Sequence, residues 1–149
     1  MDTDVFSFLM KPSDPRYSVY LARTKGKLLA ISFITVGELL FGAIKKKWGA
    51  QKLADLNERI RRVAVVPYDQ KLCETYGDLK AKLRDKGKTV ADNDLWIASC
   101  AVRHAVPLVS HNRAHFEGIP GLVLISEAPV IAQIQSQGTL PGIVPTKTP

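Results

Sequence analysis

The sequence predicts an α/β sandwich in which helices surround a mostly parallel central sheet. Short, mainly apolar runs at 28–32, 63–66, 107–110 and 122–125 are typical of buried parallel strands. Segments with helical periodicity alternate with these runs. With 149 residues, 46% of them hydrophobic, the chain is long and apolar enough for one domain with its own core.

Caps, prolines and glycines predict where the helices begin and end. Two short helices are expected over 5–10 and from Asp14 to about Arg23. Thr35 is expected to cap the third helix, and Glu38 then stands at its N3 position, which is the spacing of a capping box. The remaining helices are expected after Gly49, from Asp69 to Gly87 and from about 92 to 104, with a loop or single turn at 111–116.

The distribution of charge indicates a polyanionic partner. The net charge is +7, and 18 of the 21 Lys and Arg residues lie at or before Lys88. Such a basic surface suits nucleic acid, although a solvated basic face or an acidic protein partner would give the same pattern. Cys73 and Cys100 have no metal-ligand spacing and are expected to be reduced and buried.

Membrane insertion and export are not indicated by the sequence. No apolar run approaches the roughly 20 residues that span a bilayer. The N-terminus has no basic region followed by an apolar stretch, so no signal peptide is predicted and the expected location is the cytoplasm. We expect one domain at 1–126 and a partly disordered C-terminal extension at 127–149, in which 130–134 could form a short helix.

Acidic residues stand where apolar segments meet loops or helix starts. Asp2 would close a first strand, Glu38 lies in the first turns of a helix, and any of Asp92, Asn93 and Asp94 could cap another. The carboxyl ends of parallel strands converge on one edge of a sheet, where clustered carboxylates repel each other unless a cation is bound. Carboxylates and water suit Mg²⁺, so a metal site that hydrolyses phosphodiesters is predicted.

Four blocks in this order resemble PIN-domain ribonucleases, in particular the VapC-type toxins of toxin–antitoxin pairs. The blocks are Asp2-Thr3-Asp4, Ile31 to Ala43, Asn93 to Ala98, and Leu108 to Asn112 with the following Phe116 and Ile119 to Leu122. The resemblance implies a PIN-like three-layer α/β/α sandwich and a metal-dependent endoribonuclease. It further implies an RNA substrate, a homodimer and inhibition by a cognate antitoxin.

The resemblance also assigns roles to residues of this chain. Asp2, Glu38 and Asp94 match the family's acidic catalytic and metal-binding residues, and Asn112 matches the fourth metal position. The implied ion is Mg²⁺ or Mn²⁺. Candidates for a supporting role around these ligands are Asp4, Thr35, Asp92 and Ser110.

The chain departs from the family pattern at two places near the predicted site. Only Met1 precedes Asp2, where relatives carry several apolar strand residues, so we expect a central strand to be nearly absent and the natural start to lie upstream. His115 stands where many relatives have Asp or Glu, and we interpret it as a surface residue in a less acidic site.

Two other interpretations of the sequence remain open. The chain could be a catalytically weakened PIN module that binds RNA or an antitoxin. Alternatively, Asp2-Thr3-Asp4-Val5 matches the Asp-x-Asp-x-Val motif of haloacid-dehalogenase-type phosphatases, with Lys88 and Asp92 as a later motif. The phosphatase alternative leaves the block around Glu38 unexplained.

Overall fold

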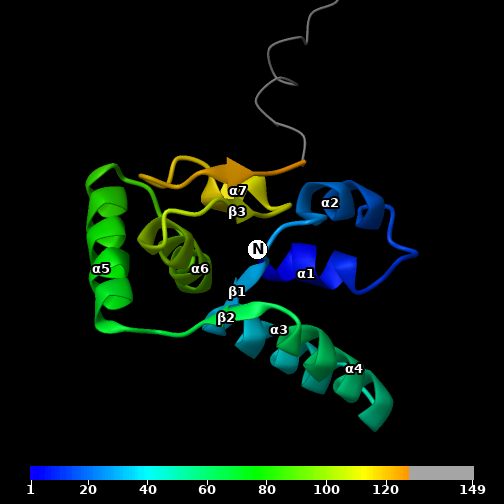
Figure 1. The fold of residues 1–149 in the computed structure, drawn as a ribbon. Coiled ribbons are helices and arrows are strands. Elements are labelled where there is room, and N and C mark those ends of the chain that lie inside the picture. Colours follow the sequence, from blue (N-terminus) through cyan, green and yellow to red (C-terminus); the bar gives the residue numbers. More distant parts are fainter. Residues whose placement is uncertain (128–149) are drawn as a thin grey trace, which may run out of the picture.

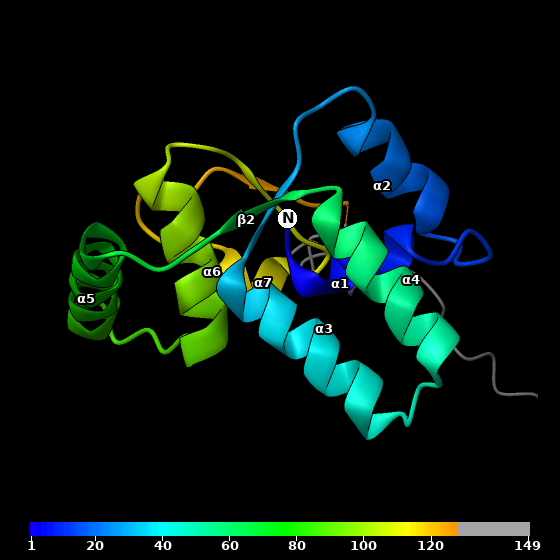
Figure 2. The same ribbon diagram turned by 60° about the horizontal axis from the view of Figure 1, so that its bottom comes forward.

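The computed structural model describes residues 1–127, which form helices around short parallel strands (Figure 1). In chain order the elements are α1 (Thr3–Leu9), α2 (Tyr17–Thr24), β1 (Ala30–Ser32), α3 (Phe33–Lys45), α4 (Ala50–Arg61), β2 (Ala64–Val66), α5 (Gln70–Asp85), α6 (Asp92–Arg103), β3 (Leu108–Val109), α7 (Arg113–Phe116) and β4 (Leu124–Ile125). Helices α5 and α6 lie on one side of the strands, and α1, α3 and α4 lie on the other (Figures 1 and 2). The predicted α/β fold class is confirmed.

The parallel strands form two separate pairs, β1 with β2 and β3 with β4. The first two residues of the chain lie between the pairs. The amino group of Met1 donates to the Ala30 carbonyl of β1 at 2.6 Å, and the Asp2 amide donates to the Val109 carbonyl of β3 at 2.9 Å. A two-residue bridge therefore stands in the place of a central strand, as the short start predicted.

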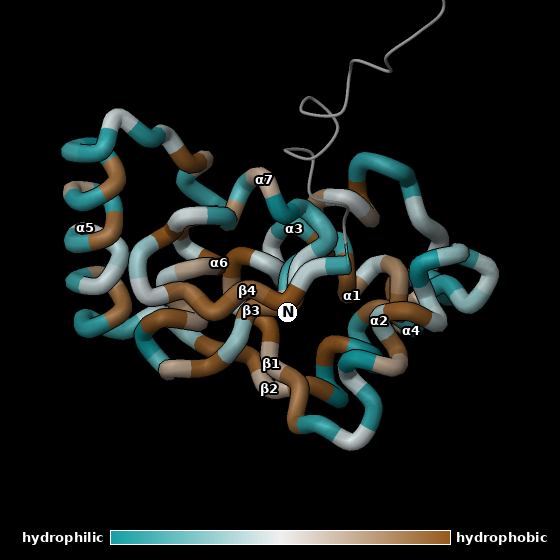
Figure 3. Tube along the Cα trace, turned by 90° about the horizontal axis from the view of Figure 1, so that it is seen from above, coloured by the Kyte–Doolittle hydropathy of each residue, from teal (hydrophilic) through white to brown (hydrophobic). Residues whose placement is uncertain are grey.

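Two apolar clusters lie on either side of this bridge. The first joins α5, α6, β3 and α7 through buried side chains that include Leu83, Leu95 and Phe116. The second joins α1, β1, α3 and α4 and includes Ile31 and Leu56. Hydrophobic residues gather around the strands and the N-terminus, and α5 turns its apolar side toward α6 (Figure 3). The clusters bring the first turns of α1 and α6 toward the same opening.

The predicted helices are present, with small differences at their starts. Asp69 caps α5 by accepting a hydrogen bond from the Leu72 amide at 2.7 Å, as predicted. The expected side-chain cap of α6 is absent, because the helix begins at Asp92 and its cap residue is Ala91. Residues 111–116 contain the single helical turn α7.

Three further predictions concern cysteines, membranes and the C-terminus. Cys100 is buried, but Cys73 is exposed in the first turn of α5, so the prediction that both are buried is wrong for Cys73. Within residues 1–127, no helix has the length and apolar character needed to cross a bilayer. The predicted extension at 127–149 and its short helix at 130–134 lie outside the described residues, apart from Glu127.

Candidate active site

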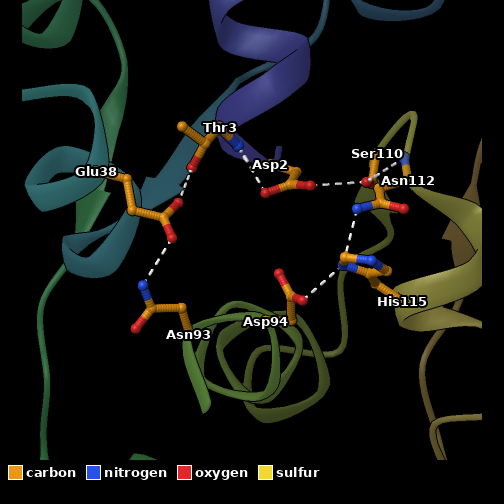
Figure 4. A network of polar contacts seen from close by, with 8 residues as sticks. All are labelled: Asp2, Thr3, Glu38, Asn93, Asp94, Ser110, Asn112 and His115. Atoms are coloured by element: carbon orange, nitrogen blue, oxygen red, sulfur yellow. Dashed lines mark hydrogen bonds and ion pairs between the residues drawn. The ribbon is translucent and has the colours of Figure 1, made fainter. Parts of the chain in front are cut away.

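The predicted acidic residues line one open cavity of about 600 Å³ between α1, α3, α6 and the start of α7. Figure 4 shows how the polar side chains of the cavity and the neighbouring Ser110 are arranged around a common centre. The lining residues are Asp2, Thr3, Asp4, Ser7, Glu38, Ala91, Asp92, Asn93, Asp94, Asn112 and His115. All four predicted metal ligands are therefore brought together.

Asp2 lies at the bottom of the cavity and is only 6% exposed. Its carboxylate accepts hydrogen bonds from the Thr3 amide, which makes it the cap of α1, and from the Ser110 hydroxyl, both at 2.7 Å. Burial raises the pKa of Asp2, and the nearby charges of Asp94 and Glu38 raise it further, while the two hydrogen bonds lower it. The pKa of Asp2 is raised overall, because burial outweighs the two hydrogen bonds.

Glu38 has a different local role from the one that its spacing predicts. The cap of α3 is Ser32, whose hydroxyl accepts from the Thr35 amide at 3.0 Å, so the capping box of Thr35 and Glu38 does not form. The Glu38 carboxylate instead accepts from the Thr3 hydroxyl at 2.5 Å and from the Asn93 side-chain amide at 2.8 Å. Glu38 is thus held over the cavity by two neighbouring elements, α1 and α6.

Asp94 and Asn112 meet His115 on the opposite side of the cavity. The Nδ1 atom of His115 lies 2.8 Å from Asp94 Oδ2 and 2.8 Å from Asn112 Nδ2. Asn112 is fixed in turn by its backbone amide, which donates to the Ser110 hydroxyl at 3.0 Å. His115 is half-exposed, but it is part of the polar network and not an isolated surface residue.

The four predicted supporting residues have different positions. Ser110 is fully buried and bonds Asp2, whereas Thr35 contacts the Ser32 hydroxyl at 3.1 Å and does not line the cavity. Asp4 accepts from the His111 amide at 3.1 Å, and burial, with the charge of Asp2, raises its pKa to about 6.

Asp92 is at the cavity rim, but its carboxylate faces α5. It accepts from the Tyr76 hydroxyl at 2.6 Å and pairs with Lys80 at 2.7 Å. The Lys80 contact, followed by the Tyr76 contact, lowers the pKa of Asp92. The two aspartates of the first turn of α6 therefore have different environments, and only Asp94 points into the network of Figure 4.

Sequence reasoning missed Thr3 and Asn93 as parts of the site. Each directly precedes or follows a predicted ligand, and each donates a hydrogen bond to Glu38, which lies at least 35 positions away in the sequence. Their adjacency to Asp2 and Asp94 was the signal that could have placed them near the site. Their pairing with Glu38 could not be predicted, because it depends on how α1, α3 and α6 come together.

A second and larger groove of about 960 Å³ continues from the cavity between α1, α3 and α4. Thr3, Ser7 and Glu38 line both hollows. The groove combines apolar side chains such as Leu39 and Trp48 with charged side chains of both signs. Its basic residues are Lys11, Lys46, Lys52, Arg59 and Arg62, and its acidic residues are Asp14, Glu38, Asp55 and Glu58. An acidic cavity thus opens into a groove of mixed charge.

The donor set of the cavity fits a divalent cation of the kind that binds oxygen ligands. Among residues 1–127, no three His, Cys, Asp or Glu side chains stand close enough together to hold a metal ion as they are. Carboxylates and an amide are nevertheless the ligands that Mg²⁺ and Mn²⁺ prefer. A bound cation would also relieve the repulsion between Asp2, Asp94 and Glu38.

Comparisons with known proteins show the family of this chain. A family model described as the PIN domain matches residues 1–122. The chain belongs to the PIN domain family. It is 32% identical over 125 residues to "Ribonuclease VapC2" of Rickettsia felis, covering 83% of this chain and 93% of that protein. It is also 32% identical over 121 residues to "tRNA(fMet)-specific endonuclease VapC" of Salmonella typhimurium, covering 81% and 89%.

Solved structures show the same relationship. The PIN chain resembles VapBC2 from Rickettsia felis bound to a promoter DNA fragment, with a TM-score of 0.74, 30% identity, and coverage of 84% of this chain and 95% of that one. DNA-bound VapBC from Salmonella typhimurium gives the same score and identity, with 84% and 94% covered. The predicted resemblance to VapC-type PIN proteins is confirmed.

The phosphatase interpretation of Asp2-Thr3-Asp4-Val5 is wrong. The PIN match covers this motif together with the Glu38 block that the phosphatase alternative leaves unexplained. Lys88 donates to the Glu117 carbonyl and does not line the cavity, so the proposed later motif does not reach Asp2.

Proposed function

We propose that this PIN domain is an endoribonuclease that hydrolyses RNA phosphodiester bonds with a divalent cation, Mg²⁺ or Mn²⁺, and that it acts in the cytoplasm as the toxin of a toxin–antitoxin pair. The observation that carries the proposal is the convergence of Asp2, Glu38 and Asp94 on one open cavity. Two relatives that are named as a ribonuclease and an endonuclease support it, because this chain aligns with 93% and 89% of their length.

In this proposal Asp2, Glu38 and Asp94 hold the cation, and Asn112 supplies a fourth group. When bound, the cation activates water and stabilises the charge that develops on the phosphate. A cavity lined by carboxylates repels RNA phosphates, so the same cation is needed for the substrate to enter.

The surrounding side chains keep the ligands in place before substrate arrives. Ser110 and the Thr3 amide orient the two oxygens of Asp2, while the Thr3 hydroxyl and Asn93 orient those of Glu38. Donors fixed in this way keep the carboxylate oxygens aimed at the cavity. The basic side chains of the groove would neutralise phosphates on either side of the scissile bond.

The partners in this proposal are a cognate antitoxin and a second copy of the chain. The groove next to the active site offers apolar contacts with five basic and four acidic side chains, which suits an amphipathic segment that carries charges of both signs. The similar solved structures are VapBC toxin–antitoxin complexes, which supports an antitoxin here. Light scattering on the purified chain, alone and with its antitoxin, measures both assemblies.

The decisive experiment is RNA cleavage in Mg²⁺ or Mn²⁺ by the wild-type chain and by Asp94→Asn. We expect the substitution to slow cleavage by at least about 100-fold, because a ligand of the cation is lost. The matched control is Asp85→Asn, which alters an exposed aspartate at the end of α5, and it should cleave like the wild type.

Two outcomes would contradict the proposed mechanism. Equal cleavage by the wild type and Asp94→Asn would remove Asp94 from the reaction. If neither protein cleaves RNA but both bind it, the chain is instead the catalytically weakened binding module. If the wild type does cleave RNA, sequencing the ends of the cleaved RNA after brief expression would identify its target.

A further inference from the structure

An imidazole nitrogen lies among the oxygen ligands of the proposed site. His115 Nδ1 is 2.8 Å from Asp94 Oδ2 and 2.8 Å from the Asn112 side-chain amide. Asp94 and Asn112 are both proposed cation ligands, and His115 lines the same cavity. The histidine therefore contacts half of the ligand set directly (Figure 4).

The position of His115 is fixed by the turn that carries it. The neighbouring Phe116 is 1% exposed and belongs to the apolar core. Arg113, at the other end of α7, donates to the Ser126 carbonyl at 3.0 Å. The His115 amide donates to the Asn112 carbonyl at 3.1 Å. The side chain of His115 is half-exposed, but the backbone of the turn that carries it is anchored at both ends.

The contacts of Nδ1 conflict with each other when no cation is bound. The nitrogen can accept from the Asn112 amide or donate a proton to Asp94, but one nitrogen cannot do both. A cation between His115 and Asp94 satisfies the nitrogen and the carboxylate together. Two ligand atoms at adjacent octahedral corners, each about 2.1 Å from the ion, are about 3.0 Å apart, which is close to the spacing found here.

Resting on the proposed function, we propose that His115 is a nitrogen ligand of the active-site cation and that it makes the site select a first-row transition ion, such as Mn²⁺ or Co²⁺, over Mg²⁺. Mg²⁺ favours all-oxygen surroundings, whereas imidazole binds first-row transition ions more readily. A site of three carboxylates, an amide and an imidazole therefore discriminates between ions that a purely carboxylate site would accept more evenly.

Pulsed electron paramagnetic resonance of the chain loaded with Mn²⁺ tests this assignment directly. The wild type should show the nitrogen modulation of a directly bound imidazole, and His115→Asp should lose it while still binding Mn²⁺ through oxygen. His104→Gln is the matched control, because His104 is exposed at the opposite end of α6 from Asp94, and it should keep the modulation.

Calorimetric titration at one fixed pH measures the selectivity. The Kd for Mn²⁺ and Co²⁺ should rise about tenfold in His115→Ala, while the Kd for Mg²⁺ changes much less. In His115→Asp the preference should shift toward Mg²⁺. Absence of nitrogen modulation in the wild type, or equal losses of Mg²⁺ and Mn²⁺ affinity in His115→Ala, would contradict the proposal.

RNA cleavage by the wild type, measured in parallel, separates this inference from the proposed function. Nitrogen coordination without RNA cleavage would contradict the ribonuclease function and leave His115 as a ligand. RNA cleavage without nitrogen coordination, and without a preference for Mn²⁺ or Co²⁺ over Mg²⁺, would contradict the role of His115 and leave the ribonuclease function intact.

Discussion

The floor and the rim of the active cavity are built in different ways. The floor consists of Asp2 and Ser110, which are 6% and 0% exposed. The Asp2 amide, which bonds β3, and the Met1 amino group, which bonds β1, together link the two strand pairs. The rim consists of Glu38, Asn93, Asp94 and His115, whose side chains form hydrogen bonds to one another and to Thr3 and Asn112. The floor is therefore part of the folded framework as well as of the proposed site, whereas the rim contacts stay within the polar network of the cavity.

Among variants that distinguish the floor from the rim, Asp2→Ala is expected to have the largest effect, on both stability and RNA cleavage. The substitution removes the cap of α1 and leaves the buried Ser110 hydroxyl without its acceptor, so unfolding should become easier by about 1–3 kcal/mol. RNA cleavage should be lost at the same time. Chemical denaturation in the presence of EDTA measures the change in stability.

Two further variants make this test specific. Asp2→Asn keeps an oxygen that can cap α1, so it should lose cleavage but keep most of the stability. Asp94→Ala should lose cleavage with little change in the free energy of unfolding, because it removes a partly exposed rim carboxylate. If Asp94→Ala destabilises the chain as much as Asp2→Ala does, the distinction between floor and rim is wrong.

A smaller effect is expected from pH on the metal-free protein, through Asp4 beside the floor. Its folded pKa is raised from 3.8 to about 6, so between these values the folded state holds a proton that the unfolded state has lost. Stability should therefore fall as pH rises from about 4 to about 6. Since Asp4 is partly exposed, we expect a contribution of about 1–2 kcal/mol.

Denaturation of the wild type and Asp4→Asn across this pH range isolates the contribution. The asparagine variant should show a shallower fall in stability with rising pH, because the titrating group is gone. Addition of Mn²⁺ should offset the fall in the wild type, since a cation favours the ionised carboxylates nearby. An identical pH dependence in both proteins would show that Asp4 does not titrate in this range.

The sequence predicted which segments form helices and strands better than it predicted where each helix begins. Short apolar runs at 28–32 and 63–66 identified β1 and β2. β1 is largely buried, as such a run predicts, but the expectation of burial is wrong for β2, in which Val65 is 42% exposed. The start of α3 could not be predicted, since Ser32 and Thr35 are both good caps three residues apart. Only the tertiary contacts that draw Glu38 toward Thr3 and Asn93 distinguish them.

The same limit applies to the site. Asp2, Glu38 and Asp94 are predicted as ligands because they match motif positions of the family. The place of His115 could not be identified in this way, because it departs from the pattern at that position. Its contact with Asp94 crosses 21 residues and depends on how α7 packs against α6. Long-range contacts of polar side chains leave no periodic signal in a sequence.

The smallest effect is expected for Asp92→Asn, which tests whether proximity alone places a residue in the rim. Asp92 lies two residues before Asp94, but its partners are Tyr76 and Lys80 on α5, and the Lys80 pair is exposed on both sides. The substitution should change the RNA cleavage rate by less than about twofold, because exposed pairs contribute little and no ligand is lost. A loss as large as that of Asp94→Asn would extend the rim to the outer face of α6, and it would mean that the Lys80 contact positions the first turn of that helix for catalysis.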